Sequence, residues 1–202
     1  MGSPAQQLKD VDCKNRAVLR KWLEKNHRQK ESVWLILHKK NSLSGNLTYK
    51  DALEEGLCFG WIDSKTSKLN DETYKLLYSP RKPKSAWSKV NKAKIEKLIN
   101  DGLIHPAGLA KIEAAKKDRS WNALDSIEEF KLPAELEKAL NKNKTAKNYF
   151  EAFPPGVRKQ IMWWIETAKQ SETKQKHVKE TVELAAKNIR ANQYLPKLGL
   201  KS

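Results

Sequence analysis

The spacing of apolar and polar residues predicts that helices and strands alternate near the start of the chain. Residues 15–26 place their apolar side chains at i, i+1, i+4 and i+5, which predicts an amphipathic helix. Residues 32–40, SVWLILHKK, form a short, β-rich apolar run with polar flanks. A run of this length and composition is typical of a buried strand.

Capping residues bound a second helix and place a hairpin after it. Thr48 is a favourable N-cap for YKDALEEGLCF, with Asp51 at the N3 position as an aspartate variant of the capping box. Gly60 is suited to end that helix in the left-handed conformation. The segments 61–69 and 73–81 flank the turn residues NDE, which predicts an antiparallel hairpin.

The rest of the chain carries helical patterns. Ser88 as N-cap and Gly102 as a stop bound a helix within SKVNKAKIEKLINDG. Pro106 and Pro133 stand where proline is common, in the first turn of a helix. Further stretches with apolar residues at helical spacing follow Pro133.

These patterns predict an α+β fold with two domains, which a length of 202 residues accommodates. We predict a small α+β domain with a short antiparallel sheet at 15–125 and an all-helical domain at 126–195. The termini, 1–14 and 196–202, are expected to be flexible.

A strong excess of lysine and arginine indicates an anionic partner. The formal net charge is +16, and residues 64–100 contribute +7 of it through ten basic and three acidic residues. Tyr74, Tyr78 and Trp87 are interleaved with these lysines, a combination that suits phosphates and stacked rings. Nucleic acid, a phosphorylated small molecule or an envelope component would fit this charge. A second interpretation stays open, in which the lysines only solubilise the surface and the tyrosines simply belong to one face of a sheet.

Other classes of site are not indicated by the sequence. The four histidines stand far apart and the two cysteines form no CxxC pair, so we expect neither a metal site nor a cofactor. Cys58 falls at a predicted helix C-terminus, where the dipole opposes a thiolate, and is expected to be a buried small hydrophobe. The absence of a signal-like run, of a span of about 18 apolar residues and of a disulfide framework leads us to expect a cytoplasmic protein without a transmembrane segment.

One candidate site lies where the hairpin opens. If the two strands pair around NDE, Asp63 and Arg81 come close together at its open end. Such a pair either locks the hairpin to the following loop or holds a ligand. The candidate ligand-binding residues, with no catalytic residue assigned, are Trp61, Asp63, Arg81, Lys82, Lys84, Trp87, Lys89 and Asn91.

Several segments resemble the YdeI/OmpD-associated family of bacterial proteins. The matching pieces are SVWLILHKK at 32–40, LTYKDALEEGLCFGWID at 47–63, SPRKPKSAWSKVNKAKIEKLINDGLIHPAG at 79–108, SWNALD at 120–125 and PPGVRKQIMWWIETAKQSETK at 154–174. Two departures stand out: Ser64 occupies a position where the family often has glycine, and Lys174 one where it usually has arginine.

The resemblance implies a role connected with bacteriocin protection or resistance to antimicrobial peptides, and a first domain of the YjbR/CyaY type. It carries over no catalytic residue. Because a cationic protein repels cationic peptides, the net charge favours an indirect role in such resistance.

Three hypotheses about function follow. The first is a non-enzymatic protein that binds an anionic ligand through the basic, Trp-containing face. There, Arg81 grips a phosphate or carboxylate, Trp87 stacks, Asn91 donates a hydrogen bond and Asp63 orients Arg81. The second is an enzyme acting on a small anionic substrate around Asp63 and Arg81. The third is a protein-interaction module whose basic surface is only solubilising. The protein partner and the oligomeric state stay open.

Overall fold

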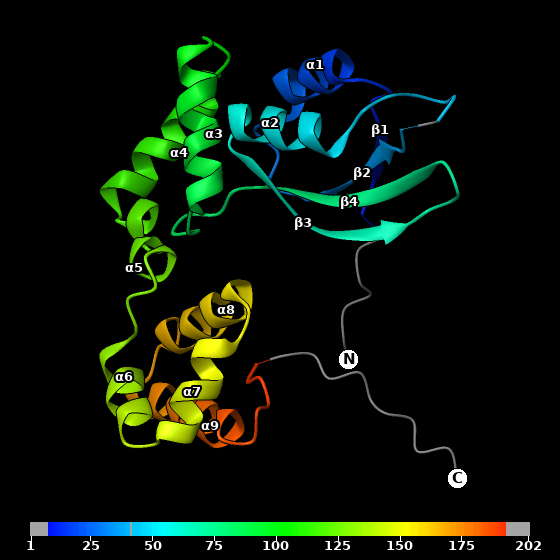
Figure 1. Cartoon of the computed structure of the whole chain (residues 1–202). Helices are drawn as coiled ribbons and strands as arrows, with labels where there is room; N and C mark the ends of the chain where they lie inside the picture. The colour runs from blue at the N-terminus through cyan, green and yellow to red at the C-terminus, as the bar shows by residue number, and fades with distance from the viewer. Residues whose placement is uncertain (1–7, 41, 193–202) are drawn as a thin grey trace, which may run out of the picture. The chain divides into compact units, whose positions relative to one another are not determined.

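The chain divides into two compact units, with the boundary between Ala123 and Leu124. The structure is a computed structural model and describes residues 8–40 and 42–192. The expected flexible ends at 1–7 and 196–202 lie outside the described residues. Figure 1 shows the chain coloured along its length, and each unit is described by itself.

A four-stranded mixed sheet forms the base of the first unit. Its strands run in the order β1-β2-β4-β3, with β1 parallel to β2 and the other neighbours antiparallel. The predicted strand and hairpin are confirmed, while β1 comes from a segment expected to be flexible and makes the sheet mixed rather than purely antiparallel. The strands are β1 (Asp10–Asp12), β2 (Val33–His38), β3 (Trp61–Lys68) and β4 (Thr73–Pro80).

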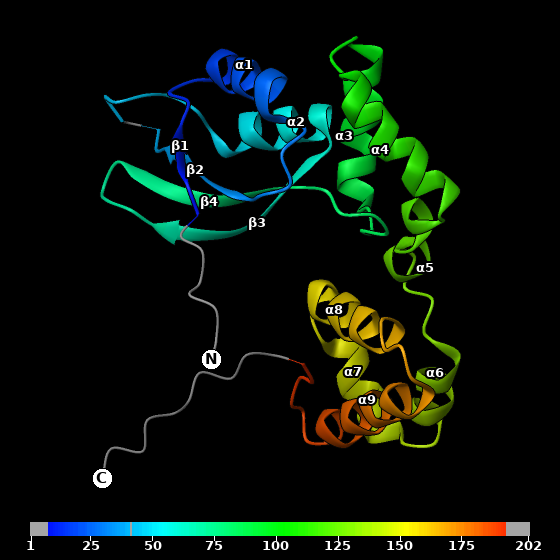
Figure 2. The ribbon, with the colours of Figure 1, turned by 180° about the vertical axis from the view of Figure 1, so that it is seen from behind.

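Helices α1 (Arg16–Asn26) and α2 (Tyr49–Phe59) lie on one face of this sheet, as both Figure 1 and Figure 2 show. Strand β2 alternates buried and partly buried residues, and its Leu35 and Leu37 are fully covered. The apolar side chains of α1, α2, β2 and β4 form one core. Helices α3 (Lys89–Asn100) and α4 (Pro106–Lys117) and the short 3₁₀ turn η1 (Ser120–Asn122) complete the unit.

The predicted capping residues are confirmed around α2. The Thr48 side chain accepts a hydrogen bond from Asp51 N, and the Asp51 carboxylate in turn accepts one from Thr48 N, closing the capping box. Gly60 ends the helix at φ 74°, the left-handed conformation that glycine adopts at little cost. The chain therefore turns at once from α2 into β3.

The second unit is helical, as predicted. Its apolar core gathers side chains from all of its helices, including Ile127, Leu136, Phe150 and Ile161. The helices are α5 (Asp125–Glu128), α6 (Ala134–Asn141), α7 (Lys144–Ala152), α8 (Pro155–Glu166) and α9 (Ser171–Ala185).

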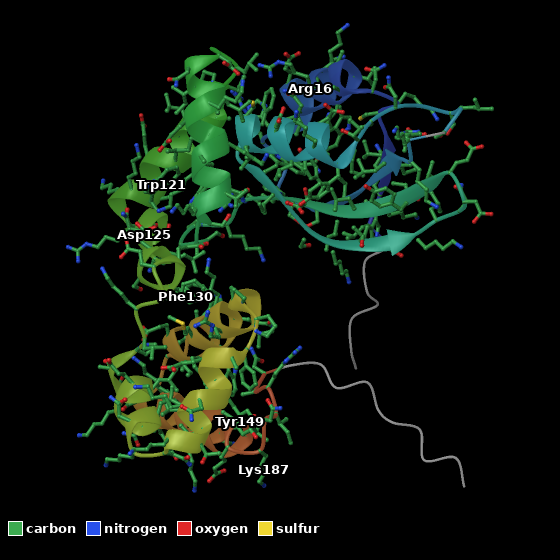
Figure 3. The ribbon with its side chains drawn as sticks, in the orientation of Figure 1. Arg16, Trp121, Asp125, Phe130, Tyr149 and Lys187 are labelled. Atoms are coloured by element: carbon green, nitrogen blue, oxygen red, sulfur yellow. The ribbon has the colours of Figure 1, made fainter. Side chains whose placement is uncertain are left out.

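Two cationic contacts stabilise the second unit from within. The ring centroid of Phe130, a residue labelled in Figure 3, lies 4.5 Å from the guanidinium carbon of Arg158. Lys174 bridges Glu135 of α6 and Glu166 of α8, with N–O distances of 3.4 and 3.2 Å. Lys174 therefore makes two ion pairs within its own unit.

Candidate functional site

The open end of the hairpin and the basic segment after it meet, as the sequence predicts. Trp61 pairs with Pro80 at the end of the ladder, and Arg81 N donates a 2.9 Å hydrogen bond to Gly60 O. The backbone of Arg81 is therefore fixed against the turn between α2 and β3. Its side chain then folds over the loop ahead of α3, where the guanidinium carbon lies 3.5 Å from the centre of the Trp87 ring.

Arg81 is a buried cation with incomplete hydrogen bonding. Only 5% of the residue is exposed, Nη1 donates to Ala86 O at 3.2 Å, and Nε has no hydrogen-bond partner among the described residues. Burial lowers the pKa of Arg81 to about 10, against the opposing influence of the Asp63 carboxylate. A buried guanidinium with an unused N–H is a group that an anion would stabilise.

Asp63 is held by a different partner from the one the sequence suggests. Its carboxylate accepts a hydrogen bond from Tyr49 Oη at 2.9 Å. The pKa of Tyr49 is raised to about 12, first by partial burial and then by this bond to a carboxylate. Asp63 thus influences Arg81 only through its charge.

An open cavity of about 980 Å³ lies beside Arg81. Its wall is built from the segment after α1, the turn at Gly60, the end of β4 and the first turn of α4. The positively charged and imidazole side chains that line it are His27, Arg28, Lys30, Arg81, Lys82, His105 and Lys111, and its described lining contains no aspartate or glutamate.

The N-terminus of α4 adds to this positive field. Helix α4 begins at Pro106, and a helix N-terminus carries a partial positive charge. Ala107 N, the first amide of the helix because proline has none, donates to Nδ1 of His105 at 3.2 Å. The helix therefore contributes its dipole to the cavity while its first amide stays capped.

The structure separates the residues expected in the site into three groups. Arg81 and Lys82 line the large cavity. Lys84 and Trp87, together with Arg81 and Lys82, line an adjoining cavity of about 70 Å³. The others lie outside both of these cavities: Trp61, Asp63, Lys89 and Asn91.

The two tryptophans do not present free rings. Trp61 is 1% exposed and Trp87 is 2% exposed. The Trp87 ring packs against Arg81 on one side and Trp121 on another, with ring centroids 5.2 Å apart in the second contact. Trp87 therefore positions Arg81 within the protein.

Sequence reasoning missed the cavity residues that come from distant segments, namely His27, Arg28, Lys30, His105 and Lys111. Helix α4 brings two of them into place because it packs directly against the end of α2. His105 N donates to Cys58 O at 3.1 Å, and a Cβ added at Gly108 would lie 2.2 Å from that same oxygen. The glycine at 108 was the one local signal of this close approach.

Within residues 8–40 and 42–192, no group of three or more His, Cys, Asp or Glu side chains is placed to hold a metal ion. Cys58 is buried, as expected, and burial raises the pKa of its thiol to about 11. Over the same residues, no helix has the length and apolarity needed to cross a membrane.

Comparison with known families matches both units. Residues 11–111 match a domain of unknown function (DUF8412), and residues 129–188 match the family described as "Bacteriocin-protection, YdeI or OmpD-Associated" (OmdA). No curated protein and no solved structure matched the chain, so the likeness of the first unit to YjbR/CyaY folds stays a prediction. The chain therefore belongs to the DUF8412 family through its first unit and carries an OmdA, YdeI/OmpD-associated domain in its second unit.

Proposed function

We propose that the α+β unit binds a small anionic ligand, carrying a phosphate or carboxylate group, in the cavity beside Arg81. The observation that carries this proposal is the buried, unpartnered Nε of Arg81 at a cavity whose described lining has cations and no acid. Uncompensated cations in a partly enclosed space attract an anion more strongly than lysines scattered over a flat surface.

The surrounding residues suit such a ligand in a second way. Pro80, Pro83, Pro106 and Leu77 line the same cavity and offer apolar contact to the body of the ligand. Small-molecule sites commonly combine an apolar wall with a few polar groups that fix orientation. Trp87 holds the Arg81 guanidinium in place, which reduces the entropy that the side chain loses on binding.

A binding role of this kind fits the bacteriocin-protection family through an indirect route. A net charge of +16 opposes direct capture of a cationic peptide. We therefore place the function of the first unit in recognition of an anionic metabolite or headgroup. The enzyme hypothesis centred on Asp63 gains no support from the cavity, since Asp63 is not part of its lining.

Titration calorimetry of the full chain with pyrophosphate tests the proposal. The double variant Lys82→Ala/Lys111→Ala removes two cations from the cavity wall and should weaken binding about tenfold or more. The matched control is Lys89→Ala, since Lys89 is exposed, belongs to the same basic stretch and lies outside the cavity. The control should bind within about twofold of the parent.

Three results would contradict the proposal. Equal weakening by Lys89→Ala and by the double variant would indicate a diffuse basic face. Unchanged binding in both, or none in the parent chain, would favour the interpretation that the lysines only solubilise the surface.

A further inference from the structure

Two histidines from distant segments touch inside the cationic cavity. The ring centroids of His27 and His105 are 4.8 Å apart at an interplanar angle of 57°. Phe59 stacks on His105 with centroids 4.6 Å apart and supports the pair from the core. Both imidazoles line the cavity that Arg81 also lines.

Backbone contacts hold these imidazoles in opposite tautomers. Nδ1 of His27 lies 3.0 Å from Leu23 O and 3.1 Å from Glu24 O. Because carbonyl oxygens only accept, Nδ1 of His27 must carry a proton, and in the neutral ring Nε2 then keeps a lone pair. Nδ1 of His105 accepts from Ala107 N at 3.2 Å, so the proton of the neutral ring is on Nε2.

The surroundings favour the neutral form of His105. Its pKa is lowered, first by partial burial, then by the positive charge that His27 would carry if protonated and by Arg20 and Arg28, with Glu24 opposing them. One imidazole of the pair therefore accepts a hydrogen bond through Nε2 while the other donates one through Nε2.

We propose that the ligand group bound at this pair is a tetrahedral oxyanion that still carries a proton, such as hydrogen phosphate. This inference rests on the proposed function and names the anion. The P–OH donates to Nε2 of His27, and a P–O⁻ oxygen accepts from Nε2–H of His105. Arg81, Lys82 and Lys111 compensate the remaining charge.

Sulfate has nearly the same size and shape but no proton at neutral pH. It offers only acceptor oxygens, so the lone pair on Nε2 of His27 would face a second acceptor. A site built around a hydrogen bond rejects an analogue that lacks the required group, because its own polar atom is then left unpaired. The pair thus predicts selectivity between two common oxyanions.

Calorimetric titration of the full chain at pH 7 with inorganic phosphate and with sulfate tests this inference. The parent chain should bind phosphate about tenfold or more tightly than sulfate. The variant His27→Phe keeps a ring but loses the acceptor, so the preference should fall to near one. The control His177→Phe alters a histidine of the second unit, where His177 stacks on Trp164, and should leave the preference unchanged.

The outcomes distinguish this inference from the proposed function. Equal affinity for phosphate and sulfate in the parent chain overturns the inference and leaves anion binding intact. An unchanged preference in His27→Phe, with folding checked by circular dichroism, also overturns it. Failure of the parent to bind either anion or pyrophosphate contradicts the proposed function itself. A glycerol phosphate arm shows whether a phosphomonoester or only free phosphate is bound.

Discussion

The guanidinium carbon of Arg81 lies 3.5 Å from the centre of the Trp87 ring. The contact joins the end of β4 to the residue just before the N-cap of α3, and 5% of Arg81 and 2% of Trp87 are exposed. A cation over an indole face is stabilised by the ring quadrupole, most strongly where water is excluded. The contact therefore fixes the position of the Arg81 guanidinium beside the cavity.

Removal of the indole should destabilise the first unit. Trp87→Ala is expected to lower the free energy of unfolding by about 3–5 kcal/mol, because it leaves a large void and removes the ring under Arg81. Trp87→Phe keeps an aromatic ring and should cost less. Denaturant unfolding followed by circular dichroism measures both variants. Parent-like stability of Trp87→Ala would contradict the role given to this contact.

Two glycines should respond in opposite directions to the same substitution. In α4, a Cβ at Gly108 would lie 2.2 Å from Cys58 O, so Gly108→Ala must push α4 away from α2. In α8, nothing lies within 4 Å of a Cβ at Gly156, and alanine is the better helix former. In thermal unfolding, Gly108→Ala should have a lower Tm than the parent, whereas the Tm of Gly156→Ala should equal or exceed that of the parent. A neutral Gly108→Ala would refute the close packing that brings His105 to the cavity.

The parts of the fold that could be predicted from the sequence are those specified by a few neighbouring residues. Thr48, Asp51 and Gly60 specify the start and end of α2 through caps that depend on a few neighbouring residues. The turn after Lys68 is equally local: Asn70 Oδ1 accepts from the amides of Glu72 and Thr73 and closes the hairpin. Features of this kind are written in short stretches of sequence.

Features that depend on tertiary packing were not predictable. Strand β1 has three residues, too few for a periodic pattern, and it exists because Val11 pairs with Leu35. The burial of Trp87 could not be predicted from its local sequence, because most of the residues around it are serines and lysines. The cavity itself arises from the approach of α4 to α2, and no local pattern places His27 beside His105.

Both cysteines should resist thiol reagents in the folded protein. Burial first, and then the charge of Asp12 or Glu55 respectively, raises the pKa of Cys13 and of Cys58 to about 11. The thiolate is the reactive form, so its fraction at pH 8 is very small. Titration with DTNB at pH 8 should label neither thiol in the native chain and both in guanidinium. Rapid labelling of the native chain would contradict this burial.

Stability should fall on mild acidification through His105. The folded protein lowers the pKa of His105 from its ordinary value of 6.5, so the unfolded chain takes up the proton first as the pH decreases. The contribution of His105 to the free energy of unfolding is therefore fully present above about pH 6.5 and decreases as the pH drops through the window below it. Protonation also removes the acceptor that caps Ala107 N.

The variant His105→Asn isolates this effect, because asparagine is a good N-cap that does not titrate. Urea unfolding in phosphate-free buffer at pH 7.5 and pH 5.5 should show a larger loss of stability in the parent than in the variant. Titratable groups far from residue 105 contribute equally to both proteins and cancel in the comparison. Identical losses in the two proteins would mean that His105 does not couple proton uptake to the packing of α4, and that its tautomer is set by something other than the cap.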